Sequence, residues 1–387
     1  MYKTGLIRLL FTESMSKKDA HSIVHYHNFA KLFSCQLQVQ DKLYVQFVSH
    51  SSFWKNDTIN NNRSLESYDS VIGQHYNNTL NRVESIEQTS NSNNSTDDPQ
   101  SPSTLINQHY QRLKRLESIY DSYYKVLYKF NPKLNVTLIP PSLATNQSSS
   151  SSSSSSSSLT SINPKDEIGI DVLFIDQQDQ PYIKQQQQQQ QQFIKVDSIN
   201  YPIDNYKYSI YDDTVQMESS DRESWKPIFK GVVLGGTFDR IHPGHKILLT
   251  MAALLCSEYM EVGITDNSIL KSKKYSELIA PFETRTQITK QFLQNVNPNV
   301  EYNMLKLIEP YANTCTSTRL QNIVISPETL KTALYINQVR RETNLKPLEI
   351  YSISYFDGVE QGGDVKLSST YLRHLDFIKL QQQETKE

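Results

Sequence analysis

The chain has 387 residues, with 39 Lys plus Arg against 41 Asp plus Glu and three cysteines. This balance excludes a whole-molecule attraction to nucleic acid or to anionic membranes, so any anion site must be local. Three widely separated cysteines argue against a disulfide framework or a zinc module and indicate a reducing compartment. No apolar run reaches the ~20 residues of a membrane helix. We expect a soluble, cytoplasmic protein without a nucleic-acid or membrane partner.

Residues 1–55 and 104–200 predict a smaller α/β region, because short apolar runs alternate there with stretches of helical spacing. The predicted elements in chain order are a strand at Gly5–Phe11, a helix at Ala20–Phe33, a strand at Lys42–Val48, a helix at Ile106–Leu127 and strands at Leu134–Ile139 and Gly169–Ile175. We expect the second helix to pack only against its own neighbours. No residue of this region is assigned chemistry.

Three polar segments interrupt that region, at residues 56–103, 146–162 and 177–192. They hold too few apolar residues to offset the entropy cost of ordering the chain. The second contains an unbroken serine tract and the third an unbroken glutamine tract, compositions typical of tolerated loop insertions. We therefore predict a partly disordered N-terminal region, which a linker at residues 201–227 joins to the rest of the chain.

From residue 228 to residue 382 strand-like runs alternate with helices, which predicts a doubly wound α/β domain with a parallel sheet. Strands are predicted at Gly231–Leu234, Met260–Ile264, Tyr302–Leu307, Asn322–Ile325 and Leu348–Ile353, and helices at Gly244–Tyr259, Phe282–Val296 and Glu328–Asn344. In the second helix Ile288, Phe292 and Val296 recur every four positions and predict its buried face. Such sheets bind ligands at the carboxyl ends of their strands.

The most informative segment is the corner at Gly235–His245, which follows the first of these strands and opens the first helix. Gly235 and Gly236 allow the backbone to approach a ligand closely. Thr237 adds a hydroxyl, and the unpaired N–H groups of the helix N-terminus attract anions. The segment therefore predicts a phosphate site. It matches neither a Walker loop nor the Gly-x-Gly-x-x-Gly fingerprint of dinucleotide-binding folds.

His242 and His245 stand three residues apart in this corner, and their N–H groups can stabilise phosphate oxygens. A lone histidine at such a position more often caps the helix or is satisfied in the core. The company of Thr237, Gly244 and the preceding strand favours His245 as the first catalytic candidate. The other alternative is a metal pair, but no third ligand stands at suitable spacing, so we predict no metal site.

Near the C-terminus Ser368, Ser369 and Thr370 precede apolar residues at helical spacing, which predicts the start of a helix. Its free N–H groups and hydroxyls can hold the outer phosphates of a nucleotide, and Arg373, about one turn further, can hold the leaving pyrophosphate. Taken alone, the pattern is more typical of an ordinary capped helix. Its place at the far end of the domain that begins with the phosphate corner favours the nucleotide.

These motifs resemble the nucleotidyltransferase superfamily, whose members carry a Thr-Phe-Asp turn followed by His-x-Gly-His and activate ATP or CTP at the α-phosphorus. Residues 230–380 as a whole resemble the phosphopantetheine adenylyltransferase domain of eukaryotic and archaeal coenzyme A synthesis. The segments that carry this resemblance are Gly235–His245, Thr265–Asn267, Leu270–Lys273, Pro281–Arg285, Ile325–Thr329 and Ile336–Arg340. The resemblance implies a Rossmann-like nucleotidyltransferase fold.

The resemblance also implies a reaction: AMP passes from ATP to 4′-phosphopantetheine, giving dephospho-coenzyme A and pyrophosphate, with Mg²⁺ carried by ATP. Thr237 and Lys271 would contact the acceptor, and with His245 they form the expected catalytic set. The basic run at Lys271–Lys274 is otherwise typical of a solvated loop, and we hold that view for Lys273 and Lys274. The implied nucleotide-binding residues are Gly235, Gly236, Thr237, Phe238, His242, His245, Glu328, Asn337, Arg340, Ser368, Ser369, Thr370 and Arg373.

Two departures from related enzymes limit what the resemblance implies. Bacterial enzymes of this activity carry Arg-Gly-x-x-Arg after the fourth strand, whereas this chain has Ser326–Thr329, so Arg340 or Arg373 is the candidate to compensate. For Glu328, Asn337 and Arg340 an ordinary polar helix face is an equal alternative. Animal coenzyme A synthase continues into a kinase with a Walker-type loop that this sequence lacks, so we expect a separate dephospho-coenzyme A kinase to act next.

Three other functions stay open: a cytidylyltransferase of phospholipid synthesis, a nicotinamide-mononucleotide adenylyltransferase and a non-catalytic scaffold. The first should carry Arg-Tyr-Val-Asp-Glu and an Arg-Thr-x-Gly-Ile-Ser-Thr-Ser ending, and the sequence has neither. Class I aminoacyl-tRNA synthetases share His-x-Gly-His but need Lys-Met-Ser-Lys-Ser, and Lys366–Thr370 lacks the second lysine. The complete set of phosphate-binding residue types disfavours the scaffold.

Overall fold

The computed structural model of the chain describes residues 2–11, 28, 31–32, 35–36, 38–49, 102–140, 172–176, 195–199, 226–309, 311–356, 359–360, 363–364 and 367–384. Apart from residues 102, 103, 226 and 227, the predicted insertions and linker lie outside the described residues. Most of the helix predicted at Ala20–Phe33 and residue Lys366 lie outside them as well. No helix in the described part of the chain has the length and apolarity needed to cross a lipid bilayer.

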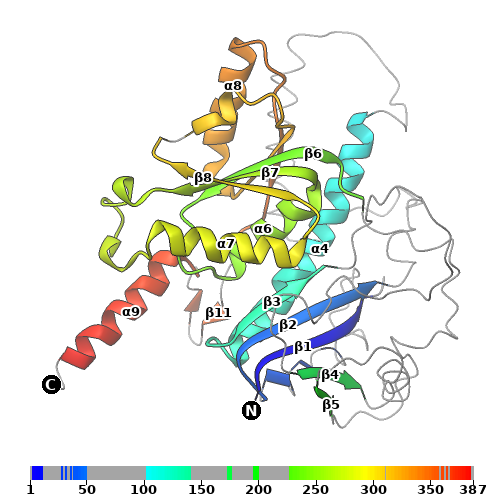
Figure 1. Ribbon diagram of the computed structural model, residues 1–387, viewed down its shortest axis with the longest axis vertical. Helices are drawn as coiled ribbons and strands as arrows, with labels where there is room; N and C mark the ends of the chain where they lie inside the picture. The colour runs from blue at the N-terminus through cyan, green and yellow to red at the C-terminus, as the bar shows by residue number, and fades with distance from the viewer. Residues whose placement is uncertain are drawn as a thin grey trace, which may run out of the picture.

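The second half of the chain folds around a parallel sheet with the strand order β10-β9-β6-β7-β8 (Figure 1). Its strands are β6 (Phe229–Gly236), β7 (Cys256–Thr265), β8 (Glu301–Leu307), β9 (Asn322–Ile325) and β10 (Glu349–Ser352). Its helices are α6 (Pro243–Leu255), α7 (Phe282–Val296), α8 (Leu330–Glu342) and α9 (Ser369–Glu384). Because the strand order reverses next to β6, the predicted doubly wound fold is confirmed.

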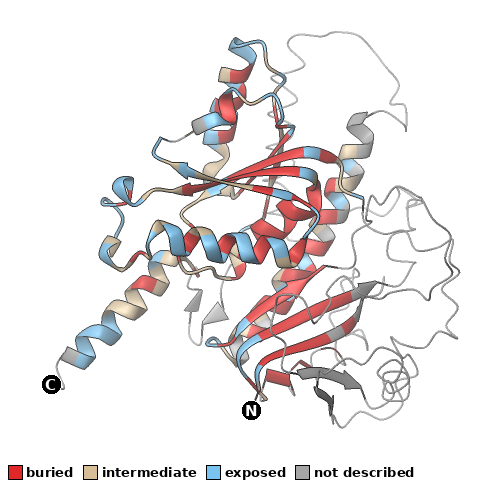
Figure 2. Cartoon of the chain, in the orientation of Figure 1, coloured by how far each residue is buried: buried red, intermediate tan, exposed pale blue. Residues whose placement is uncertain are grey.

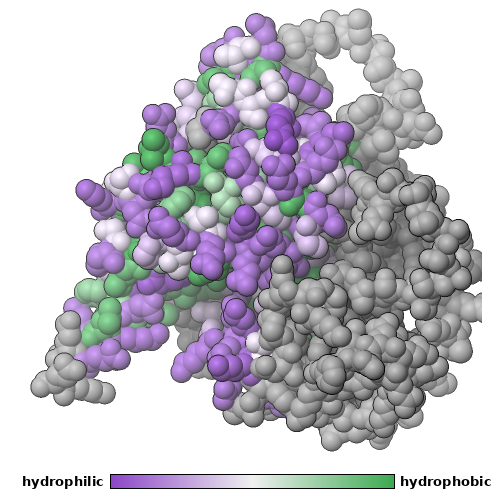
Figure 3. Space-filling model, viewed as in Figure 1, coloured by the Kyte–Doolittle hydropathy of each residue, from purple (hydrophilic) through white to green (hydrophobic). Residues whose placement is uncertain are grey.

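Short elements complete this domain. Single 3₁₀ turns lie at Asn267–Ile269, Ser276–Leu278, Ala312–Cys315 and Pro327–Thr329, and a small antiparallel hairpin is formed by β11 (Val359–Glu360) and β12 (Gly363–Asp364). Figure 3 shows mainly hydrophilic side chains on the visible face of the domain, with apolar ones in separate small groups. Single exposed apolar residues of this kind are normal on a protein surface.

Helix α6 ends earlier than the sequence predicts. The expected helix runs to Tyr259, but α6 stops at Leu255 and β7 begins with the next residue. The apolar run around this point fits helix and strand equally well, so periodicity cannot decide the boundary. Parallel pairing with β6 decides it, because Cys256 lies opposite Phe229 and Tyr259 opposite Gly231.

The buried face of α7 also differs from the expected one. Ile288 is 50% exposed, although Phe292 and Val296 are buried as predicted. The buried residues of the helix are Arg285, Thr289, Phe292, Leu293 and Val296. Spacing of four residues drifts around a helix of 3.6 residues per turn, so the stripe that faces the sheet includes a polar pair that the apolar pattern does not reveal.

The N-terminal half forms a second parallel sheet, with the order β3-β2-β1-β4-β5. Its strands are β1 (Tyr2–Phe11), β2 (Val39–Ser49), β3 (Asn135–Ile139), β4 (Val172–Asp176) and β5 (Lys195–Ile199). The last of these was not predicted. In both sheets the strand that comes first in the chain lies in the middle, with the second and third on one side and the fourth and fifth on the other. The two halves therefore share one sheet topology.

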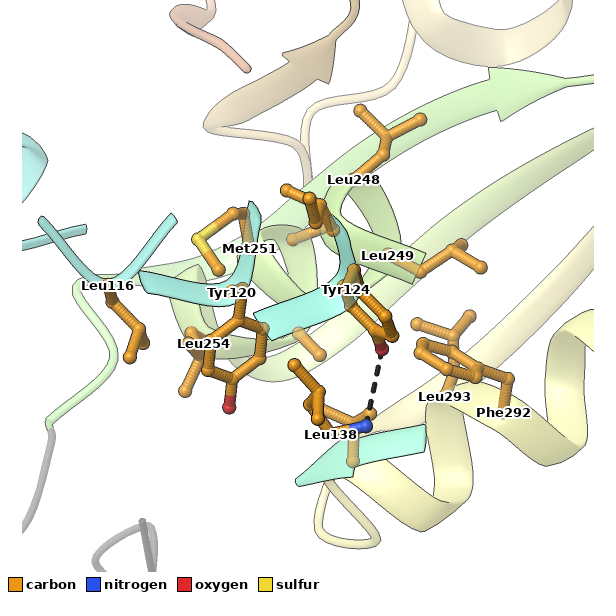
Figure 4. Packing of buried hydrophobic residues seen from close by; sticks show 14 of the residues in the cluster. Leu116, Tyr120, Tyr124, Leu138, Leu248, Leu249, Met251, Leu254, Phe292 and Leu293 are labelled. Carbon is orange, nitrogen blue, oxygen red and sulfur yellow. Dashed lines mark hydrogen bonds between the residues drawn. The ribbon is translucent and has the colours of Figure 1, made fainter. Parts of the chain in front are cut away.

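Helix α4 (Pro102–Phe130) joins the two sheets, so the expectation that it packs only on its own neighbours is wrong. Figure 4 shows Leu116, Tyr120 and Tyr124 of α4 facing the side chains of α6. One continuous cluster of buried apolar residues includes both helices and strands of both sheets, and Figure 2 shows this buried material along the strands and α6. Large aromatic side chains dominate such contacts because each buries so much area.

Polar contacts tie α4 to the end of β10 as well. The Glu117 carboxylate is 3% exposed, and it accepts hydrogen bonds from the Tyr351 hydroxyl (2.9 Å) and from the backbone N–H of Ser354. Lys114 pairs with the same carboxylate (2.9 Å) and donates to the Ser352 carbonyl (2.6 Å). A buried carboxylate needs such partners, so this network fixes α4 against the second sheet.

Replacing Glu117 by alanine is expected to lower the free energy of unfolding of the full chain by about 2–4 kcal/mol, because buried partners lose their acceptor. Urea unfolding followed by circular dichroism measures the loss. Glu258→Ala is the matched control, since Glu258 forms an exposed ion pair with Lys230 at 3.0 Å that contributes less than about 1 kcal/mol. Equal losses would contradict the role assigned to Glu117.

Candidate active site

The corner between β6 and α6 is a strained turn at the carboxyl edge of the second sheet. Phe238 and Arg240 both have a φ of 49°, a left-handed conformation that costs non-glycine residues energy. Asp239 lies between them and is completely buried. Surrounding contacts must hold such a turn, and they converge on this one carboxylate.

Three groups from separate parts of the chain hydrogen-bond to Asp239. Its Oδ2 accepts from Arg240 (2.8 Å) and from Arg373 (3.0 Å), while its Oδ1 accepts from the backbone N–H of Ala280 (3.2 Å). The two arginines neutralise the buried charge and so offset the free-energy cost of removing the carboxylate from water. The corner, the segment before α7 and helix α9 therefore meet at one point.

Helix α9 begins beside the corner, as the two sequence motifs together predict. The Ser369 hydroxyl donates to the Asp239 carbonyl at 2.7 Å, and Arg240 binds Asp376 of α9 at 2.8 Å. Ser368 caps the helix, because its hydroxyl accepts from the backbone N–H of Tyr371 (3.2 Å). The phosphate corner and the serine-rich helix start thus lie together, although 130 residues separate Ser369 from Asp239.

Arg373 is buried at 1% exposure and binds protein groups. Besides Asp239, it donates to the Lys274 carbonyl (3.1 Å) and to the Thr370 hydroxyl (3.0 Å). Next to it, the Tyr275 hydroxyl and the His374 imidazole share a hydrogen bond of 2.8 Å. Arg373 therefore joins α9 to the basic loop after β7. Its predicted contact with pyrophosphate stays a prediction, and this burial does not favour it.

Thr237 lies in this corner with a lysine on its hydroxyl. The ammonium of Lys273 donates to Thr237 Oγ1 at 2.9 Å, whereas Lys271 is exposed on the same loop. Although much of the Lys273 side chain is exposed, partial burial of its ammonium lowers its pKa, the Arg373 charge lowers it further, and Asp239 opposes both. Lys273 is thus an exposed loop residue, as expected, but its ammonium also contacts the corner.

Arg285 supports the corner from beneath, a role that the sequence analysis missed. It is 1% exposed and donates to the carbonyls of Thr237 (2.6 Å), Thr265 (2.8 Å) and Ala280 (2.9 Å) and to the Asn267 side chain (2.6 Å). Arginine suits this task because its planar fork can bind several acceptors at once. Its place at the end of Pro281–Arg285, one of the segments that carry the resemblance, was the available signal.

The two histidines of the corner stack on each other. The ring centroids of His242 and His245 lie 4.0 Å apart, and Phe238 packs 5.4 Å from His245. Burial lowers the pKa of the His245 imidazole to about 4, against the opposing charge of Asp239. His245 is therefore neutral at pH 7, and its Nδ1 lacks a hydrogen-bond partner among the described residues. A neutral imidazole has one N–H to donate, and an anion would compete for it with the Arg240 backbone.

The two glycines of the corner differ in what surrounds them. A Cβ on Gly236 would lie 3.1 Å from the Phe238 ring, so the ring would have to shift slightly. A Cβ on Gly235 would make only ordinary contacts, at 3.5 Å or more. Deeper in the sheet, a Cβ on Gly263 would collide with Leu307 at 2.6 Å. Gly235 is exposed, so the protein leaves space there for close approach from outside.

Two predicted nucleotide ligands hold the protein's own backbone. Asn337 is buried and makes paired hydrogen bonds with the backbone of Leu348, at 2.8 and 2.7 Å. Arg340 is 2% exposed and donates to the carbonyls of Thr314, Ser317 and Lys346 at 2.8–2.9 Å. These contacts close loops around α8, and they favour structural roles. Glu328 is exposed in the 3₁₀ turn after β9, where its predicted role is untested.

The arrangement suits nucleotidyl or phosphoryl transfer by positioning of the reactants rather than through a covalent enzyme intermediate. A glycine edge, a hydroxyl with its lysine, a neutral imidazole and two helix N-termini meet where parallel strands end. Such groups neutralise and orient phosphates. Among the described residues no cluster of three His, Cys, Asp or Glu side chains is arranged to hold a metal ion.

Comparison with known proteins relates this site to one family. The model of the cytidylyltransferase-like family matches residues 233–375. A phosphopantetheine adenylyltransferase of Pyrococcus abyssi is 40% identical over 145 residues, which are 38% of this chain and 89% of that protein. One of Pyrobaculum aerophilum is 35% identical over 147 residues, 38% of this chain and 92% of that protein.

A eukaryotic relative extends beyond the matched part. The phosphopantetheine adenylyltransferase of Saccharomyces cerevisiae is 34% identical over 169 residues, 43% of this chain. The match spans only 55% of the yeast protein's length. The archaeal proteins, in contrast, are matched over nearly their whole length. The chain belongs to the phosphopantetheine adenylyltransferase family.

Proposed function

We propose that this protein transfers AMP from ATP to 4′-phosphopantetheine, forming dephospho-coenzyme A and pyrophosphate. The observation that carries the proposal is the meeting of Thr237, Lys273 and His245 with the start of α9 at one sheet edge. The names of the related proteins supply the acceptor. The transfer alone is proposed, and the action of a separate kinase on its product remains an expectation from the resemblance.

The acceptor phosphate is expected to contact both the Thr237 hydroxyl and the Lys273 ammonium, which lie side by side at 2.9 Å. One of its oxygens attacks the α-phosphorus of ATP and forms a new P–O bond. The bond from the α-phosphorus to the bridging oxygen breaks, and pyrophosphate leaves with that electron pair. A phosphate oxygen is already ionised, so the step needs orientation and charge neutralisation rather than a general base.

His245 is expected to donate its N–H to the α-phosphate, where negative charge builds up in the transition state. The N-terminus of α6 adds a partial positive charge, and the exposed edge at Gly235 lets the backbone approach. The N–H groups at the start of α9 face the outer phosphates in this proposal. Mg²⁺ would arrive with ATP, because the Asp239 carboxylate is occupied by two arginines.

The proposal predicts that the full chain releases pyrophosphate from ATP only when 4′-phosphopantetheine is present. His245→Ala should lower kcat by roughly 100–1,000-fold, as loss of one donor to a transition-state oxyanion does, and leave the circular dichroism spectrum unchanged. His374→Ala, which removes a histidine of α9 that binds Tyr275, is the matched control and should not cause such a loss of kcat. Pyrophosphate release with CTP and phosphocholine, and none with 4′-phosphopantetheine, would overturn the assignment.

The two lysines of the loop after β7 give a second prediction. Lys273→Ala should raise KM for 4′-phosphopantetheine by about 10-fold or more, because a direct phosphate contact contributes at least that much. Lys271→Ala should have a smaller effect, since the ammonium bound to the Thr237 hydroxyl is that of Lys273. Steady-state kinetics with varied acceptor measure both. A larger effect at Lys271 would restore the lysine chosen from the sequence.

The low pKa of His245 gives a third prediction, independent of turnover. Burial disfavours the imidazolium, so the free protein should keep His245 neutral until the pH falls to about 4. Saturating Mg²⁺-ATP should raise this pKa, because nearby phosphate charge favours the protonated form. Imidazole ¹⁵N chemical shifts between pH 4 and 8 measure it, with His245→Gln for assignment. No response to ATP would separate His245 from the nucleotide.

A further inference from the structure

Lys246 follows His245 directly in the first turn of α6, but its side chain leaves the phosphate corner and enters the N-terminal half of the protein. Its ammonium donates to the side-chain oxygen of Asn135 (2.6 Å) and to the carbonyl of Val136. Both acceptors belong to β3, the edge strand of the first sheet. The catalytic helix of the second sheet is thus hydrogen-bonded to the first.

This anchor is costly in such surroundings. Lys246 is 6% exposed, and every residue from Lys246 to Leu255 is buried. Burial lowers the pKa of its ammonium to about 7. An apolar side chain of similar size would destabilise the folded state less at this position, because its burial removes no hydrated charge from water. The best-attested role of a buried polar group that destabilises a fold in this way is to fix one arrangement of the packed elements.

We propose that Lys246 is a positioning residue: by holding α6 on β3, it fixes the direction in which His245 faces the phosphate corner. The inference rests on the proposed function. Neighbouring residues of an α-helix are rotated by about 100°. Fixing the Lys246 side chain on β3 therefore fixes the rotation of the first turn, and His245 is turned toward Phe238 and His242.

Other contacts also join the N-terminal half to the second sheet, away from the corner. Figure 4 shows Tyr124 between α6 and Leu138 of β3, with its hydroxyl accepting from the Leu138 N–H at 3.2 Å. Glu117 of α4 binds the end of β10.

The test compares variants of the full chain by two measurements, kcat for adenylyl transfer and the His245 imidazole ¹⁵N shifts. Lys246→Met should lower kcat by about 10-fold or more, as small misplacements of catalytic groups do, and should move the His245 signals. Asn135→Ala should give a smaller change of the same kind. The double variant should be no worse than Lys246→Met alone, because both changes break one contact.

Tyr124→Phe is the matched control, since it removes a hydroxyl from the same interface and keeps the ring, which lies 5.9 Å from the Lys246 ammonium. It should lower Tm and leave kcat and the His245 signals unchanged. If Lys246→Met leaves both measurements unchanged, the inference is overturned while the proposed function stands. If Lys246→Met does not fold, unchanged values in Asn135→Ala overturn it equally. If the wild-type chain lacks transfer activity, the proposed function fails, and the His245 signals alone decide on the anchor.

Discussion

The phosphate corner depends on the hydrogen bonds and ion pairs of one buried carboxylate, that of Asp239. It lies between two residues in left-handed conformations, and it binds Arg240, Arg373 and the backbone of Ala280. Each partner comes with a different piece of the rim: the corner itself, α9 and the segment before α7. One charge therefore offsets the strain of the turn and orders the loops around it. The groups that can touch phosphate stand on this framework.

Helix α4 extends the same logic to the whole molecule. Its apolar face completes the core of the second sheet through α6, while Lys114 and Glu117 bind the end of β10. The two halves share one buried cluster, so the boundary suggested by composition at the linker separates stretches of sequence rather than independent cores. Stability and geometry at the corner therefore depend on both halves of the chain.

The sequence predicts the parallel second sheet and the strand-turn-helix corner at Gly235–His245 well, because glycines, apolar runs and two histidines three residues apart are local signals. The meeting of that corner with Ser369 also follows from the motif order. What the sequence could not supply is long-range: the packing of α4, the exposure of Ile288 and the contact of Lys273 with Thr237. The same limit explains Arg340 and Asn337, whose polar groups hold backbone carbonyls that no spacing rule identifies.

The shared strand order of the two sheets has a consequence for how this chain can change. Strands β2, β3 and β4 are each followed in the sequence by one of the polar segments, which therefore leave the first sheet at its carboxyl edge. In the second sheet that edge carries the phosphate corner, which Asp239 and Arg285 hold in place. In the first sheet, the polar segments after these strands can gain or lose residues at little cost. The contacts that support the second sheet come from elsewhere, from α4 and from the start of β3.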